Sequence, residues 1–282
     1  MAMWLSGLSS LWLWTVVVLT GAGLTLAALW LVRHTVLYAT RKPPNDVIGF
    51  VHGIVGVIYA VLLGFTIVVS WEQFAMSEKN VQGEVAIIGD LYNDNKLLSA
   101  AFREEQQTSA TQRTPTGDAL NLMQWSLNNY VKAVVEDEWH AMAEGRDSDW
   151  AKASYGWIWQ AYGRYAQFAT STPLQGIFFS ESLRKLNELG ERRRTRLDDA
   201  HRALPPRFWM VLVLGGVLII AFSLLYDVAS IRVHAMIAAS LAALICLSLA
   251  LIVSLEHPFR GGTALSSKPF MDLLDVDPWG VK

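Results

Sequence analysis

Residues 47–70 read VIGFVHGIVGVIYAVLLGFTIVVS and contain no charged side chain. A helix needs roughly 20 residues to cross the ~30 Å hydrocarbon core of a bilayer, and a charge at its centre costs about 2.5–3.5 kcal/mol. An uncharged run of this length is therefore typical of a transmembrane helix. Three further runs share this property, and they cover residues 11–32, 208–226 and 233–255.

The charges of the chain are confined to the sequence between these runs. The 282 residues are 52% hydrophobic and 17% charged, and all 23 basic and 25 acidic residues lie outside the four runs. This mosaic excludes a soluble enzyme, a collagen-like chain and a disordered chain. The single cysteine, Cys246, excludes an intrachain disulfide and a Cys-based zinc site. The net charge of −2 argues against a nucleic-acid partner.

These patterns predict an all-α membrane protein with four transmembrane helices arranged as two plus two. We expect the first pair within residues 1–70, a soluble domain over 71–207, the second pair within 208–256 and a tail over 257–282. Apolar residues recur at helical spacing in the soluble segment, which predicts helices there. One example is the stripe of Leu120, Met123, Leu127, Tyr130 and Val134.

The second transmembrane helix is predicted to continue into the soluble domain. No proline occurs between Val47 and Ala101, so nothing in this stretch signals a break. By contrast, Pro43-Pro44 prevents a continuous helix in the link before it. Breaks are also expected at 114–117 and 145–148, where Gly, Pro and polar residues cluster.

Basic residues near the membrane ends predict the topology. The two short links carry few of them: Arg33, Arg41, Lys42 and Arg232. The opposite side carries nine: Lys79, Arg192, Arg193, Arg194, Arg196, Arg202, Arg207, Arg260 and Lys268. Because cytoplasmic segments carry the excess of Lys and Arg, we expect a multi-pass inner (plasma) membrane protein with the soluble domain and both termini in the cytoplasm.

One face of the predicted long helix is unusually polar. Its members, the polar stripe, alternate at spacings of four and three: His52, Gly56, Tyr59, Leu63, Thr66, Ser70, Gln73, Ser77, Asn80 and Glu84. Such a stripe must avoid lipid. One hypothesis is a pore lining, with Leu63 as an apolar narrow point and Glu84 as a charged ring in an oligomer. The alternative is helix packing, since Gly56, Thr66 and Ser70 are small residues that let helices approach.

Other candidate sites are weaker. The cluster of Arg192, Arg193, Arg194 and Arg196 is a candidate for binding anionic lipid heads or phosphate, or else a topology signal. Glu136, His140 and Glu144 share one helical face, which is typical of a solvated face, with metal ligation as the alternative. Glu256 and His257 at the end of the fourth run are interpreted as an interfacial cap, with a proton or cation site as the alternative. We expect no metal site, no cofactor and no catalytic residue, because phosphate-binding, dinucleotide, metalloprotease and nucleophile-elbow motifs are absent from the sequence.

Several blocks together resemble the bestrophin-like domain family of unknown function, which is common in bacteria. The most specific are GVIYAVLLGF at 56–65 and EHPFRG at 256–261. Supporting blocks are Trp71-Glu72, VQGE at 81–84, DEW at 137–139 with Gly145, the segment 192–205 with Trp209, and SKPF at 267–270. The resemblance covers about residues 47 to 270 in the same order.

The resemblance implies a function. Bestrophins are homopentameric anion channels with four membrane helices and a helical cytosolic part; their second helix lines the pore, and calcium gates some of them. We therefore expect an oligomeric ion channel, not an enzyme, whose partners are the bilayer, inorganic ions and other copies of itself. The ion sign stays open, because Glu72 and Glu84 favour cations while the resemblance favours anions. The alternative hypothesis is a non-conducting membrane scaffold or sensor whose cytosolic helices bind a protein or lipid.

Overall fold

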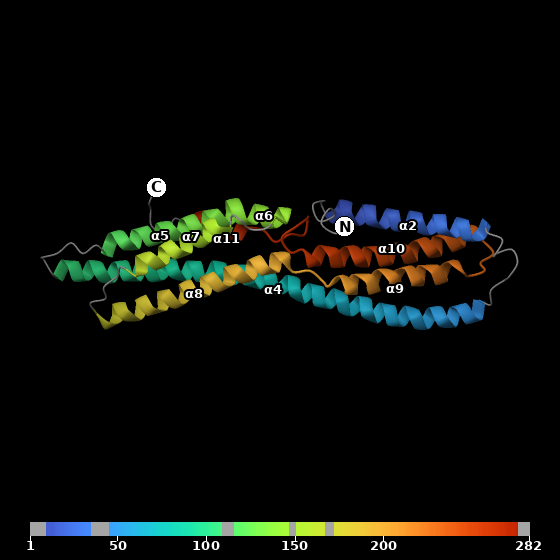
Figure 1. Ribbon diagram of the computed structural model, residues 1–282, viewed down its shortest axis with the longest axis horizontal. Helices are drawn as coiled ribbons and strands as arrows, with labels where there is room; N and C mark the ends of the chain where they lie inside the picture. Colours follow the sequence, from blue (N-terminus) through green and yellow to red (C-terminus); the bar gives the residue numbers. More distant parts are fainter. Residues whose placement is uncertain (1–9, 35–44, 109–115, 147–150, 167–171, 276–282) are drawn as a thin grey trace. The chain divides into compact units, whose positions relative to one another are not determined.

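The structure, a computed structural model, describes residues 10–34, 45–108, 116–146, 151–166 and 172–275. Within these ranges every regular element is a helix and no strand occurs. The elements, in chain order, are α2 (Ser10–His34), α4 (Asn45–Thr108), α5 (Thr116–Ala133), η1 (Val134–Glu138), α6 (Trp139–Glu144), α7 (Ala151–Tyr165), α8 (Pro173–His201), α9 (Pro206–Leu224), α10 (Ile231–Glu256) and α11 (Lys268–Asp275) (Figure 1). The predicted all-helical class is confirmed.

Four helical segments are long and apolar enough to cross a membrane: Trp14–His34, Asn45–Ala100, Pro173–Leu224 and Ile231–Glu256. Three of the uncharged runs lie within α2, α4 and α10, and the run 208–226 extends two residues past the end of α9 at Leu224. The helix α4 is 64 residues long, so it spans about 95 Å at 1.5 Å per residue. The predicted absence of a break after Val47 is confirmed, whereas the side of the membrane reached by its second half stays a prediction.

Helix ends follow the local sequence. Pro206 is the first residue of α9. Proline has no backbone N–H, and at this position an N–H would find no acceptor within the helix. The helix α10 ends at Glu256, two residues before Pro258. Gly145 ends α6 with a left-handed φ of 69°, which glycine adopts without strain. The predicted break at Pro43-Pro44 lies outside the described residues, as do parts of the breaks at 114–117 and 145–148.

The chain divides into two compact units, one within Met1–Ala75 and Arg202–Thr263 and the other within Met76–His201 and Ala264–Lys282. In the first unit α2 packs closely along α10 (Figure 1). A β-carbon added at Gly21 would lie 2.2 Å from Cys246 Sγ, so glycine is what permits this approach. Near one end of the pair, the indole of Trp14 donates to Ser254 Oγ at 3.2 Å. Near the other, Arg33 donates to the carbonyl of Val228 at 2.6 Å.

The second unit has its own core. The helices α5 and α7 pack against each other. The predicted stripe of Leu120, Met123, Leu127, Tyr130 and Val134, which runs from α5 into η1, is buried throughout. The short helix α11 contributes Phe270, which is fully buried. Its ring meets the ring of Trp139 edge-on, with the centroids 5.8 Å apart.

Candidate functional site on the long helix

The polar stripe begins in the first unit, where its members contact α9. Tyr59 is buried and its hydroxyl donates to the carbonyl of Leu212 at 3.1 Å. The ring fits against Gly215 and Gly216, where added β-carbons would lie 2.6 and 3.0 Å from Tyr59 atoms. A side chain at Gly215 is therefore incompatible with this position of the ring.

The stripe residues next to Tyr59, namely His52, Gly56 and Leu63, contact α9 or residues just after it. Nδ1 of His52 lies 3.3 Å from the Tyr226 hydroxyl, and Leu63 packs against the cluster of Tyr59, Ile219 and Ile245. A β-carbon added at Gly56 would lie 4.0 Å from Cδ1 of Ile219, so Gly56 also faces α9.

Two hydroxyl-bearing stripe residues follow. Thr66 is buried and donates to the carbonyl of Leu62 at 2.9 Å, one turn back in its own helix. Ser70 is buried as well. Such placements are what the packing alternative expects of small residues on this face.

The stripe continues through Gln73, at the end of the first unit, into the second unit, which begins at Met76. Ser77 is buried, and Gln73 is half-buried. Asn80 is buried and donates to Asp199 Oδ2 on α8 at 2.9 Å.

Glu84, the last stripe residue, belongs to a buried charge cluster. It accepts from Arg196 at 2.8 Å and from the hydroxyl of Tyr130. Arg196 also donates to Glu138 at 2.6 Å, and Glu138 in turn accepts from Arg193 at 2.6 Å. Glu84, Glu138 and Arg196 are fully buried. Because two acids face two guanidinium groups, the charges compensate each other inside the unit.

A distortion of the helix after α5 places Glu138 in this cluster. Residues Val134–Glu138 form a π-helix, and the N–H of Trp139 bonds to the carbonyl of Val134, five residues back. A π-helical turn shifts the facing of the residues that follow it. Glu138 also accepts from the hydroxyl of Ser154 on α7, so its contacts join η1, α7 and α8.

The cluster changes the acidity of its members. Burial alone would raise the pKa of Glu138, but Arg196 and Arg193 outweigh burial and lower the pKa below its ordinary value of 4.5. Burial and the neighbouring Glu84 raise the pKa of Tyr130 well above 10.0. Both groups therefore keep one protonation state at neutral pH, Glu138 ionised and Tyr130 neutral.

The predicted arginine cluster is split by the structure. Arg193 and Arg196 are buried in the ion pairs just described. Arg192 is half-buried beside α4, and Arg194 is exposed. Lipid or anion binding by this cluster stays a prediction, and Arg194 is its most accessible member.

The remaining candidates have ordinary placements. Glu256 accepts hydrogen bonds from the N–H of Leu204 and, at 3.1 Å, from the indole of Trp209, which agrees with a cap. Burial, followed by Arg260, lowers the pKa of His257.

The acidic and histidine residues singled out on the helix after α5 are also accounted for. Glu136, His140 and Glu144 are exposed. Among the described residues, no three His, Cys, Asp or Glu side chains are grouped to hold a metal ion.

Sequence patterns did not identify the partners of the stripe. The sequence does not link Asp199, Tyr130 and Ser154 to Asn80, Glu84 and Glu138, because these pairs form only in the folded chain. One signal was available: Arg193 falls within an otherwise apolar helical repeat of α8 that includes Leu186, Gly190 and Ala200. A charged residue in a buried stripe requires a buried partner of opposite charge.

The side of α4 opposite the polar stripe has no such contacts. Its residues, the exposed stripe, are all exposed on the single chain: Phe50, Ile54, Val57, Val61, Gly64, Val68, Glu72, Ala75, Lys79, Gln82 and Ala86. They also follow spacings of three and four, which keeps them on one face of a helix. The stripe is apolar up to Val68 and carries both charges and amides beyond it.

Comparison with known proteins identifies the fold. The chain is similar to crystal structures of a bacterial bestrophin homologue from Klebsiella pneumoniae. One variant has 12% identity and a TM-score of 0.67, over 94% of this chain and 98% of that one. Another has 15% identity and a TM-score of 0.65, over 94% of this chain and 99% of that one. At these identities the likeness concerns the fold alone.

The sequence itself gives the family. No curated protein matches the chain. The family model of the bestrophin-like domain matches residues 19–270. Because this match spans most of the sequence, the chain belongs to the bestrophin-like domain family.

Proposed function

We propose that this protein is a homo-oligomeric membrane channel in which ions move passively along a central path lined by α4. Membership of the bestrophin-like family and the four helices able to cross a membrane support this proposal. The observation that carries it is the exposed stripe. A face of α4 that is exposed on one chain, opposite a face packed against α9 and α8, is what a helix surrounding a shared path requires.

The chemistry of the exposed stripe suits a gated path. In its first half, Val57 and Val61 present branched apolar side chains of which 66% and 53% are exposed. A ring of such residues narrows a pore and opposes wetting. In its second half, Glu72, Lys79 and Gln82 offer polar groups to hydrated ions.

The polar stripe competes with the exposed stripe for the role of pore lining. It stays a prediction from the sequence, with Leu63 as its narrow point. Its contacts favour the exposed stripe, since Tyr59, Asn80 and Glu84 already have partners within the chain. Substituting serine at Val61 and at Leu63 therefore separates the two assignments.

We propose that the four long helices cross the plasma membrane and that the second unit lies in the cytoplasm, as the distribution of basic residues predicts. At the cytoplasmic end, the charged residue of α4 nearest the membrane-spanning part of the exposed stripe is then Glu72. Because Glu84 is neutralised by Arg196, the choice between cations and anions depends on Glu72 and Lys79.

Cryo-microscopy of the purified protein, combined with ion flux in reconstituted vesicles, tests the proposal. We expect a ring of copies with α4 nearest the axis, together with a flux that scales with the protein content of the vesicles. A monomer or dimer with no central path and no flux would favour the scaffold or sensor alternative.

A further inference from the structure

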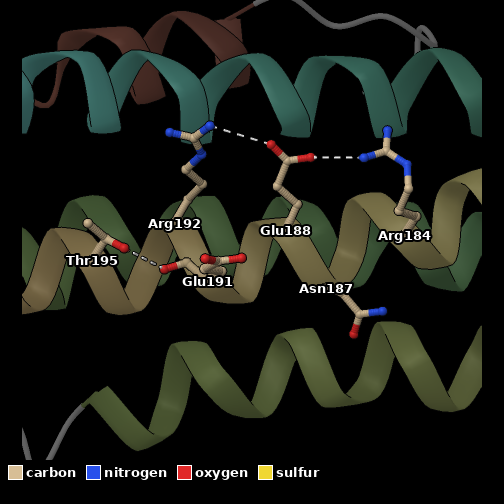
Figure 2. A pocket seen from close by; sticks show the side chains of 6 residues that line it. All are labelled: Arg184, Asn187, Glu188, Glu191, Arg192 and Thr195. Atoms are coloured by element: carbon tan, nitrogen blue, oxygen red, sulfur yellow. Dashed lines mark hydrogen bonds and ion pairs between the residues drawn. The ribbon is translucent and has the colours of Figure 1, made fainter.

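A shallow groove of about 520 Å³ runs along α8 in the second unit. Its lining residues are Arg184, Asn187, Glu188, Glu191, Arg192 and Thr195 (Figure 2). They span 12 residues of helix, or about 17 Å at 1.5 Å per residue. The groove is therefore long enough to receive three turns of another helix.

The groove carries a row of charged side chains, and aromatic side chains of α7 lie beside it. Arg184, Glu188 and Arg192 point toward α4, and Glu188 lies between the two arginines with contacts of 3.3 and 3.5 Å (Figure 2). On the other side, Asn187 accepts from the hydroxyl of Tyr162 on α7 at 2.5 Å. The α7 side continues with Tyr155 and Trp159, whose side chains are exposed. Aromatic and arginine side chains of this kind are enriched at protein interfaces.

Arg192 has hydrogen-bonding capacity to offer a partner. Its contacts with Asn80 and Glu188 are both 3.5 Å long, and 36% of its side chain is exposed. The guanidinium has five N–H donors, more than these two long contacts use. It lies against α4 at Gly83, where an added β-carbon would be 3.3 Å from its Nη1.

A complementary charge lies on another flank of α4. Glu78 is exposed and precedes Gly83 by five residues, which turns it by about 140° around the helix. Glu78 therefore faces away from Arg192 of its own chain. Farther along the same flank, Gly89 has open space beside it, so the flank is slim enough to approach another surface.

We infer that the α4 flank bearing Glu78 lies in the α8 groove of a neighbouring copy of this chain, where Glu78 pairs with Arg192. The inference rests on the proposed oligomer. Within one chain α4 and α8 run antiparallel, as the pairings of Asn80 with Asp199 and of Glu84 with Arg196 show. Rotation about an axis parallel to α4 leaves all helix directions unchanged, so α4 of one copy also runs antiparallel to α8 of the next.

The two surfaces also fit a ring better than a two-fold dimer. A ring is built from heterologous contacts, in which one surface of each copy meets a different surface of the next. The groove and the Glu78 flank are different surfaces, and Glu78 is opposite in sign to Arg192 of the groove. With both flanks of α4 covered in this way, the exposed stripe is left to face the axis.

Charge reversal tests the pair. We expect E78R and R192E each to raise the protein concentration needed for half-assembly about tenfold, as measured by mass photometry in mild detergent, and the double variant E78R/R192E to return it to near the wild-type value. Glu136→Arg, a reversal at an exposed site on η1, serves as the control and leaves assembly unchanged.

A second measurement is needed because R192E also removes contacts with Asn80 and Glu188. In a C246A background, E78C combined with T195C should form intermolecular disulfides that appear as a ladder on a denaturing gel, whereas E78C with E136C should not. A ring without the ladder and without rescue by the double variant overturns this inference and leaves the proposed channel standing. The absence of any ring overturns both.

Discussion

The ring of Tyr59 on α4 lies directly on Gly215 of α9, where a single added carbon would stand 2.6 Å from the ring atom Cδ2. The same side chain donates its hydroxyl proton to the carbonyl of Leu212. Helices in lipid gain little from the hydrophobic effect, so they associate through close packing and hydrogen bonds. This one contact supplies both, and it fixes which face of α4 is turned away from any shared path.

Replacing Gly215 with alanine should destabilise the first unit. The added methyl group forces the Tyr59 ring out of its position, and overpacking of this kind costs about 1–3 kcal/mol. We expect a lower midpoint of thermal unfolding in detergent, followed by tryptophan fluorescence. Gly23→Ala on α2 is the matched control, because nothing lies within 4 Å of its added β-carbon. Equal midpoints for the two variants would contradict the packing described.

A second glycine contact predicts a rescue. Gly21→Ala should destabilise the α2–α10 pair, because its β-carbon would stand 2.2 Å from Cys246 Sγ. Cys246→Ala removes that sulfur and leaves a neighbour at 3.5 Å, an ordinary contact distance. We therefore expect the double variant to recover most of the stability that Gly21→Ala loses. Additive losses in the thermal midpoint would show that the two helices do not meet at these residues.

The buried charge cluster predicts a pH dependence. Burial raises and the two arginines more strongly lower the pKa of Glu138, so its folded-state pKa lies below the ordinary 4.5. Its contribution to stability is then complete at neutral pH and is lost as the pH falls below about 4.5 toward the folded-state pKa. In Glu138→Gln this acid-dependent loss should shrink, and stability at neutral pH should fall by about 3–5 kcal/mol, because two buried guanidinium groups lose a partner.

Chemical denaturation of the detergent-solubilised protein at several pH values measures this effect. Glu136→Gln is the control, since Glu136 lies two residues away on the same helical turn and is exposed. A Glu138→Gln variant as stable at neutral pH as the control would contradict a structural role for the cluster.

The membrane helices were predictable from the sequence because their signal is local. Windows without charge predict α2, α9 and α10 to within a few residues. The missing proline between Val47 and Ala101 predicts that α4 runs on unbroken, although α4 continues farther, to Thr108. The facing of the α5 stripe was equally readable, since a helical repeat of Leu120, Met123 and Leu127 has only one way to be buried.

The environment of the polar stripe was not predictable in the same way. Periodicity places Asn80 and Glu84 on one face of a helix, but it does not say whether water or protein lies opposite. Their partners Asp199 and Arg196 are more than a hundred residues away, and the π-helix that turns Glu138 toward Arg196 has no clear sequence signature. The sequence alone does not distinguish the exposed stripe, because its first half resembles any lipid-facing surface.

Thiol modification of α4 tests most directly the claim that the exposed stripe lines an ion path. In a C246A background, Val61→Cys and Leu63→Cys place one thiol on each candidate face of the same helix. Ion flux through reconstituted vesicles is then measured before and after a small charged thiol reagent. The account predicts that the reagent alters flux through the Val61→Cys protein and leaves the Leu63→Cys protein unchanged. An effect at Leu63→Cys alone would contradict it and assign the path to the polar stripe.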